Sequence, residues 1–127
     1  MLFRSPASAT GDKRPPANAM DGYFGNTDIG LVGSEMQRWV FYHPDTTYQE
    51  FGNTGTRLQE GTWYWDAFGH NCMLHQYPAD ERGFIVCHAT APGKKPGESW
   101  MEDNGAGARP FKLIKGYDLT GLKPGAE

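Results

Sequence analysis

The segment from residue 61 to residue 88 constrains the fold of this chain more than any other. It holds both cysteines, three of the four histidines and two of the four tryptophans. Three runs that contain most of the aromatic and apolar residues of this segment, 61–66, 71–77 and 83–89, are separated by turn-forming stretches at 67–70 and 78–82. Short runs bounded by turn residues are typical of β-strands. The segment therefore predicts three consecutive antiparallel strands.

The rest of the chain continues this pattern, with further strands predicted at 28–33, 38–43, 47–51, 98–101 and 110–115. The 17 Gly and 9 Pro among 127 residues favour short strands and tight turns over helices. We therefore predict one all-β domain over residues 21–127, with a loop-like C-terminal tail. Its seven or eight strands form an antiparallel meander, either a small closed barrel or a strongly curled sheet. Residues 1–20 lack periodicity and are predicted to be a flexible arm.

Strand alternation assigns side chains to faces, because successive residues point to opposite sides of a sheet. In the hairpin around residues 44–46, pairing of His43 with Thr47 separates one face with Trp39 and Phe41 from another with Val40, Tyr42 and Tyr48. In the central segment, pairing of Cys72 with Cys87 sets Leu74 opposite Ile85. Extended through the turn at 67–70, this register sets Trp65 beside Cys72 and Trp63 beside Leu74.

This register predicts two different faces for the central segment. The first face is a plausible core and carries Trp63, Trp65, Cys72, Leu74, Ile85 and Cys87. The second face is too apolar for water and too polar for a plain core, and it carries Tyr64, Asp66, Asn71, Met73, His75, Phe84, Val86 and His88.

The two cysteines bear on the cellular compartment. Their positions on adjacent predicted strands favour a disulfide across the hairpin, although two buried free thiols are the alternative. The N-terminal residues lack the apolar run of an intact signal peptide, so the chain either stays in the cytosol or has lost its leader. Because the disulfide favours an oxidising compartment, we predict a periplasmic or secreted protein.

Charge and length limit the partners of this protein. The net charge is −3 and the pI is about 5.8, and the basic residues are scattered rather than gathered in a stripe. Binding of nucleic acid is therefore not expected. No apolar run is long enough for a membrane span. A homo-oligomer or a protein partner that covers the second face stays open as an alternative.

No motif of the common cofactor enzymes occurs in the sequence, so no cofactor is predicted. The second face nevertheless carries groups suited to proton transfer. His75 is the candidate general acid or base, His88 and Asp66 tune its protonation, and Tyr64 stabilises developing negative charge. These four residues would support a cofactor-free lyase, isomerase or cyclase. The structural alternative is that Asp66, Asn71 and His88 only satisfy one another at the end of a sheet and that His75 stacks on Phe84.

The same region could also bind a small ligand or a metal. The aromatic residues exceed the need of a small core, and Trp39, Tyr42, Tyr48, Met73 and Phe84 are candidate contacts for a flat or apolar ligand. The alternative is an aromatic core that compensates for scarce aliphatic residues. His75, His88 and Asp66 could also bind a metal, together with His43 or His70 from a turn. Nothing in their spacing selects such a site, and no metal is predicted.

The chain resembles small exported bacterial proteins with a calycin-like β-meander. The resemblance rests on residues 23–27 (YFGNT), 43–48 (HPDTTY), 61–63 (GTW) and 97–100 (GESW), with the Cys72 and Cys87 pair. Similar sheets bind ligands in lipocalins and avidin-like proteins and act as cofactor-free lyases in phenolic acid decarboxylases. The chain departs from the lipocalins, because its Gly-x-Trp lies in the middle of the chain rather than on the first strand. No site residue of these families is therefore assigned to this sequence. The resemblance implies a lipocalin-like sheet that binds a small apolar or aromatic molecule.

Overall fold

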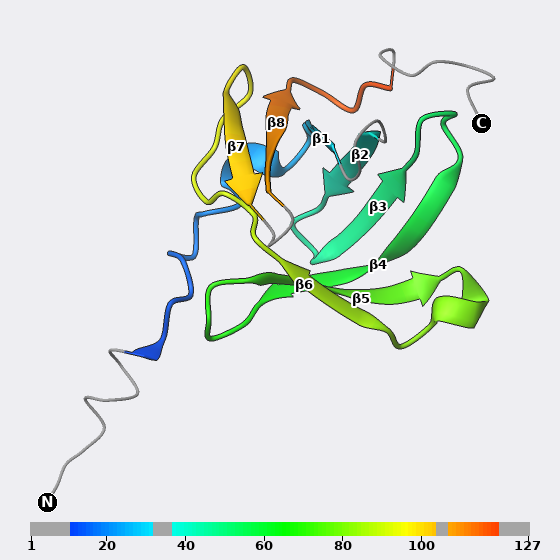
Figure 1. Cartoon of the computed structure of the whole chain (residues 1–127), viewed down its shortest axis with the longest axis horizontal. Coiled ribbons are helices and arrows are strands. Elements are labelled where there is room, and N and C mark those ends of the chain that lie inside the picture. Colours follow the sequence, from blue (N-terminus) through cyan, green and yellow to red (C-terminus); the bar gives the residue numbers. More distant parts are fainter. Residues whose placement is uncertain (1–10, 32–36, 104–106, 120–127) are drawn as a thin grey trace, which may run out of the picture.

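The computed structural model describes residues 11–31, 37–103 and 107–119. Within these residues, eight strands form one antiparallel sheet with the spatial order β6-β5-β4-β3-β2-β1-β8-β7 (Figure 1). The strands are β1 (Thr27–Leu31), β2 (Gln37–Tyr42), β3 (Thr47–Phe51), β4 (Arg57–Trp65), β5 (Asn71–Tyr77), β6 (Ile85–His88), β7 (Ser99–Asp103) and β8 (Ala108–Ile114). Two single-turn 3-10 helices, η1 (Asp21–Tyr23) and η2 (Ala79–Glu81), complete the described elements.

The sheet curls into a half-barrel and is not closed. Strands β1 to β6 follow one another as a meander, and the β7–β8 hairpin joins the far side by pairing β8 with β1. Strands β6 and β7 are the two edges of the sheet among the described residues. The prediction of an all-β, strongly curled sheet of seven or eight short strands is therefore confirmed. No helix among the described residues is long and apolar enough to cross a membrane.

Three hairpin loops share one geometry. In each, the residue before the loop donates its N–H to the carbonyl four positions later and accepts from the N–H three positions later, at loops 44–46, 53–55 and 67–69. The third loop residue has a positive φ: 71° at Thr46, 82° at Gly55 and 83° at Gly69. This is the three-residue hairpin loop whose last residue adopts the left-handed conformation, which favours glycine.

Thr46 departs from this rule, because it is a β-branched residue in a left-handed conformation. We expect Thr46→Gly to raise the free energy of unfolding by about 1 kcal/mol, since relief of backbone strain exceeds the added flexibility of the unfolded chain. The reciprocal change Gly55→Thr should lower it by a similar amount. Urea denaturation of both variants tests this. Destabilisation by Thr46→Gly would show that the side chain of Thr46 contributes more than its backbone strain removes.

The predicted register of β2 and β3 is confirmed, with Tyr42 opposite Tyr48. Cys72 also lies opposite Cys87, the two form a disulfide, and Leu74 lies opposite Ile85. Val40, Tyr42 and Tyr48 thus share a face, as expected.

The predicted register of β4 and β5 is wrong by one residue. Trp65 lies opposite Asn71, and Trp63 lies opposite Met73. The cause is the loop, because the turn contains three residues with Gly69 in the left-handed conformation rather than the four residues of 67–70. A one-residue shift exchanges the two faces of β4 relative to β5. Both tryptophans therefore share a face with Asn71, Met73 and His75, and Tyr64 shares the opposite face with Cys72.

The hydrophobic core fills one part of the concave side of the sheet. It consists of Met20, Tyr23, Tyr42, Tyr48, Trp63, Met73 and Leu113. The Tyr23 ring packs edge-on against Tyr42, with ring centroids 5.7 Å apart. The Tyr23 hydroxyl donates to the carbonyl of Ala91 at 2.6 Å. Residues Met20 to Tyr23 thus close the half-barrel at one end.

The N-terminal segment makes specific contacts with the sheet. Ala19 and Met20 are buried, although both belong to the stretch predicted as a flexible arm. The N–H of Lys13 donates to the carbonyl of Ala67 in the β4–β5 loop at 2.8 Å. Residues 1–10 of the predicted arm, 32–33 of the first predicted strand and 120–127 of the predicted tail lie outside the described residues.

Strands β4 and β5 approach each other closely at Gly61. The register shifts between Glu60 and Gly61, and Gly61 is buried opposite His75. A Cβ atom at Gly61 would lie 1.9 Å from the carbonyl oxygen of Leu74. Only glycine allows the two backbones to pack at this distance.

Candidate functional site: a pocket on the concave face

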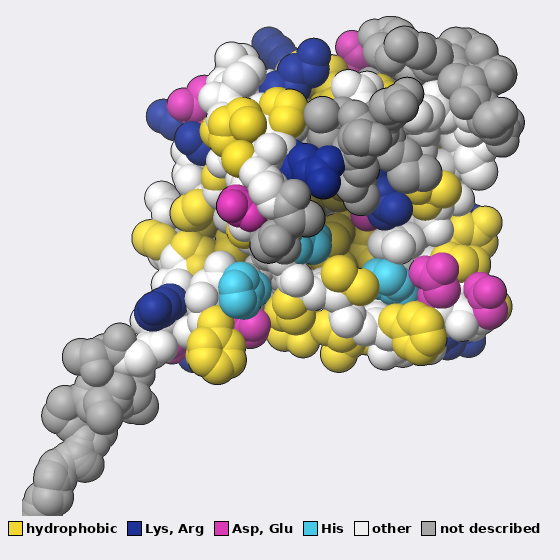
Figure 2. Space-filling model, viewed as in Figure 1, with side chains coloured by type: hydrophobic (Ala, Val, Ile, Leu, Met, Phe, Trp, Pro, Cys, Tyr) yellow, Lys and Arg dark blue, Asp and Glu magenta, His cyan; other side chains and the backbone are white. Residues whose placement is uncertain are grey.

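A pocket of about 290 Å³ occupies the part of the concave side that the hydrophobic core leaves open. Each of the eight strands contributes at least one lining residue, since alternate residues along every strand face this side. Figure 2 shows histidine and basic side chains at the margin of a hollow in this face, with hydrophobic side chains inside it. The site is therefore a product of the whole curled sheet and not of one loop.

The pocket has an apolar wall. Val40, Tyr42, Met73, Val86 and Phe111 are among its lining residues. The Phe111 ring lies directly against Gly30, where a Cβ atom would approach Phe111 Cε2 to 2.0 Å. Glycine at this position thus makes room for the ring on the pocket side of β1.

Three buried carboxyl groups face the same pocket, Asp28 from β1, Glu50 from β3 and Glu102 from β7. Two of them have partners. Glu50 pairs with Arg38. Glu102 Oε2 accepts hydrogen bonds from Trp100 Nε1 at 2.6 Å and from the N–H of Ala91 at 3.1 Å.

Asp28 differs from the other two carboxyl groups. Its residue is 6% exposed, and Oδ1 has no hydrogen-bond partner among the described residues. Buried polar atoms of proteins almost always have a partner, and exceptions call for an explanation. Asp28 Oδ1 shares this lack of a partner with Arg38 Nε, the other buried and unpartnered side-chain atom described among the lining residues, but Arg38 has an ion-pair partner in Glu50.

Burial raises the pKa of Asp28 well above its ordinary value, and the negative charges of Glu102 and Glu50 raise it further. Burial also raises the pKa of Glu102, while its hydrogen bonds to Trp100 and Ala91 act in the opposite direction. Burial makes the largest contribution to the raised pKa of the Tyr42 hydroxyl, and the negative charge of Asp28 raises it further. Burial in the pocket thus favours the neutral, protonated forms of Asp28, Glu102 and Tyr42.

Two of the predicted catalytic residues lie in the pocket. His75 is buried, and its Nδ1 lies 3.2 Å from Glu81 Oε1 in η2. His88 Nε2 lies 3.0 Å from the Met73 sulfur, and its Nδ1 lies 3.3 Å from the carbonyl oxygen of Ala89. Both rings line the pocket, together with the predicted ligand contacts Tyr42 and Met73.

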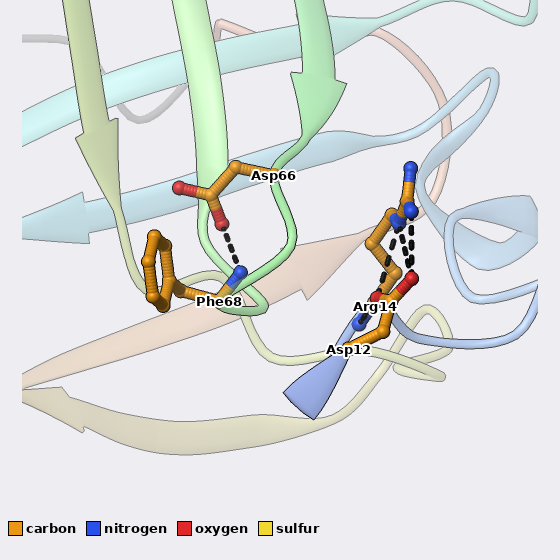
Figure 3. Close-up of polar contacts among 4 residues, drawn as sticks. All are labelled: Asp12, Arg14, Asp66 and Phe68. Carbon is orange, nitrogen blue, oxygen red and sulfur yellow. Dashed lines mark hydrogen bonds and ion pairs between the residues drawn. The ribbon is translucent and has the colours of Figure 1, made fainter. Parts of the chain in front are cut away.

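The other two predicted catalytic residues lie elsewhere. Tyr64 is 44% exposed on the opposite face of β4, as the corrected register requires. Asp66 lies in the β4–β5 turn, where Oδ1 accepts from the N–H of Phe68 at 2.9 Å (Figure 3). The same oxygen accepts from the N–H of His70 at 2.9 Å. Figure 3 also shows the Asp12–Arg14 ion pair of the N-terminal segment, which lies near this turn. The carboxylate of Asp66 thus stabilises a turn and does not face His75.

The remaining predicted ligand contacts also lie outside the pocket. Trp39 is buried, but on the opposite face of β2 from Val40 and Tyr42. Tyr48 belongs to the hydrophobic core. Phe84 precedes β6 and is 61% exposed.

The histidines and Asp66 of the considered metal set are likewise not brought together. Among the described residues, the potential metal ligands that converge within 4.8 Å are Asp66, Cys72 and Cys87. The two cysteine sulfurs are bonded to each other in the disulfide, so neither is a free thiolate ligand.

The carboxyl groups of the pocket were missed in the sequence, although two signals could have indicated them. Asp28 is a charged residue in a predicted apolar strand. Glu50 lies two positions after Tyr48 and therefore on the face assigned to Tyr42 and Tyr48. Glu102 and Arg109 gave no local signal, because they reach the pocket only through the pairing of β8 with β1.

Comparison with known proteins adds no family to this geometry. No family model, no curated protein and no solved structure matches the chain. The function is therefore argued from the pocket itself.

Proposed function

We propose that this protein binds a small organic molecule in the pocket on the concave face. The observation that carries the proposal is a buried carboxyl oxygen of Asp28 without a partner, in a pocket that otherwise has an apolar wall. Ligand sites are typically apolar cavities with a few polar groups that orient the ligand. A volume of about 290 Å³ suits a molecule of roughly one or two rings.

Binding can be tested by changing the mouth of the pocket on the edge strand β6. Val86 lines the pocket and is 49% exposed, so Val86→Trp should fill part of the pocket without disturbing the core. Ile85 is 53% exposed on the opposite face of the same strand, which makes Ile85→Trp a matched control. We expect Val86→Trp to weaken binding of small aromatic fragments at least tenfold, as measured by ligand-observed NMR.

The control separates blocking of the pocket from a general effect on β6. Ile85→Trp should leave the affinity of the same fragments within twofold of the wild type. Equal affinity of the fragments for all three proteins would place their binding outside the pocket and contradict the proposal.

Acid–base catalysis without a cofactor is a second candidate function for the same pocket. The observation in its favour is the contact between His75 and Glu81, because a carboxylate that holds one ring nitrogen orients the other for proton transfer. Asp28, with its raised pKa, could supply a proton from another strand. A bound fragment that is converted by the wild type but not by His75→Gln would support this function.

We also propose that the protein is exported and that its sheet is of the lipocalin-like, calycin-like kind. Support for export comes from the Cys72–Cys87 disulfide, which persists in oxidising compartments. The strongly curled sheet with a pocket on its concave side supports the likeness to ligand-binding β-meanders.

A further inference from the structure

We infer that the pocket selects a small molecule with a primary or secondary ammonium group on an apolar or aromatic body, and that Asp28 is the counter-ion of the ammonium group. This inference rests on the proposed function and specifies its ligand class. Three observations lead to it: the position of Asp28, the charges around it and the wall beside it.

The position of Asp28 calls for a hydrogen-bond donor. Oδ1 is buried, has no partner among the described residues and belongs to a residue that lines the pocket. A ligand in the pocket can supply a donor to this carboxyl group, which belongs to a lining residue that is 6% exposed. An ammonium N–H meets this need, and a quaternary ammonium group, which lacks N–H, does not.

The charges around Asp28 favour a cation over an anion. The carboxyl groups of Asp28, Glu50 and Glu102 face two guanidinium groups, those of Arg38 and Arg109. Arg38 pairs with Glu50. The charges of His88 and Lys94 oppose the rise that burial causes in the pKa of Glu102. Arg109 lies opposite Glu102 in the β7–β8 ladder without a described ion pair, and no positive charge is among the described influences on Asp28. Asp28 is therefore the carboxyl group that remains without a positive partner in this arrangement.

The described contacts of the two histidines do not include Asp28. His75 faces Glu81, and His88 contacts Met73 and the carbonyl of Ala89, so neither ring has Asp28 as a described partner. Tyr42, the remaining titratable group of the lining, adds no positive charge in either protonation state.

The wall beside Asp28 provides the place for the body of the ligand. Val40 lies directly opposite Asp28 in the β1–β2 ladder. Phe111 lies opposite Gly30, which is two positions from Asp28 on the same face of β1. A ligand whose ammonium group contacts Asp28 can thus place its apolar body against Val40 and Phe111.

The empty and occupied pockets differ in the protonation of Asp28. Without a ligand, burial and the neighbouring carboxylates raise the pKa of Asp28 and favour its neutral form. A cation beside the carboxyl group favours the ionised form instead. Binding of an ammonium ion is therefore accompanied by release of the Asp28 proton to the solvent.

The test uses three probes of similar size and different charge: benzylamine, benzyl alcohol and benzoate. Isothermal titration calorimetry at pH 7 with the full chain should show that benzylamine binds at least tenfold more tightly than benzyl alcohol. In buffers of different ionisation enthalpy, the heat of benzylamine binding should reveal proton release, and that of benzyl alcohol should not. Both measurements use the wild type and do not depend on the folding of a variant.

Two variants locate the effect. Asp28→Asn, which keeps the shape of the side chain, should weaken benzylamine binding at least tenfold and change benzyl alcohol binding less than twofold. Asp80→Asn, an exposed residue in η2, is the matched control and should bind all three probes like the wild type.

Three outcomes overturn the inference. Equal affinity for benzylamine and benzyl alcohol would leave the proposed pocket in place but show that it does not select a cation. Tightest binding of benzoate would assign recognition to an arginine of the pocket. Failure of all three probes to bind would contradict both the inference and the proposed binding function.

Discussion

Gly61→Ala is expected to lower the free energy of unfolding by at least about 3 kcal/mol. The methyl group would meet the carbonyl oxygen of Leu74 at 1.9 Å, far inside van der Waals contact. Because that oxygen belongs to the backbone of β5, it cannot move without disturbing the ladder between β4 and β5. The substitution acts where the register shifts between Glu60 and Gly61, so the curl of the sheet would also change.

Gly52→Ala is the matched control for this prediction. Gly52 is also buried, but a Cβ atom there would meet the end of the flexible Leu58 side chain at 3.0 Å rather than backbone. We expect a loss of no more than about 1 kcal/mol for Gly52→Ala. Urea denaturation of both variants gives the comparison, and similar losses would mean that β4 and β5 can separate at Gly61 without penalty.

Asp28→Asn is expected to make the protein progressively more stable than the wild type as the pH rises. The pKa of Asp28 is raised in the folded state, so the folded protein binds a proton that the unfolded chain releases near the ordinary pKa of 3.8. The unfolding free energy of the wild type therefore falls as the pH rises through the interval between these two pKa values. Asparagine does not titrate, so the variant lacks this loss.

The size of the difference follows from proton linkage. Within that interval, one bound proton changes the unfolding free energy by as much as about 1.4 kcal/mol per pH unit. Urea denaturation of both proteins between pH 4 and pH 8 measures the difference, and the slope is informative even if asparagine adds a constant offset. Asp80→Asn should run parallel to the wild type. A parallel curve for Asp28→Asn as well would mean that folding does not shift the pKa of Asp28.

The strands of this protein could be predicted from the sequence because their signals are local. Aromatic and β-branched residues marked β2 and β3, and the turn residues on either side marked β5, at almost their observed bounds. Proline at position 44 marked the first hairpin, and its register followed from the three-residue turn. These features depend on neighbouring residues, and the same residues form them in the folded protein.

The division of β4 and β5 into faces could not be predicted with the same security. It depended on whether the loop after Trp65 contains three or four residues, and Gly69, which adopts a positive φ, was counted as an ordinary turn residue. Counting four loop residues placed Tyr64 and Asp66 on the same face as His75 in the prediction. The observed loop of three residues places Tyr64 on the opposite face. His75 and His88 remained on one face because their register came from the cysteine pair, which is independent of this loop.

The carboxyl groups of the pocket depend on long-range pairing. Asp28 and Glu102 are far apart in the sequence and face one pocket because β8 pairs with β1 on one side and with β7 on the other. No local pattern in β7 or β8 indicates that they join the sheet beside β1. The candidate site could therefore be predicted only for residues of the β5–β6 hairpin and for Tyr42 of β2.

The free edges of the sheet have a consequence for the range of molecules that the pocket can accept. In a closed barrel, the number and stagger of the strands fix the inner diameter. Here Val86 and His88 of β6 face Glu102 of β7 across a pocket that no described backbone ladder spans. No ladder therefore fixes the distance between the two edges, and a described link between them is the hydrogen bond from the N–H of Ala91, just after β6, to Glu102 Oε2. A ligand that contacts both edges would hold them at a fixed distance, so the length of the ligand would set the width of the half-barrel.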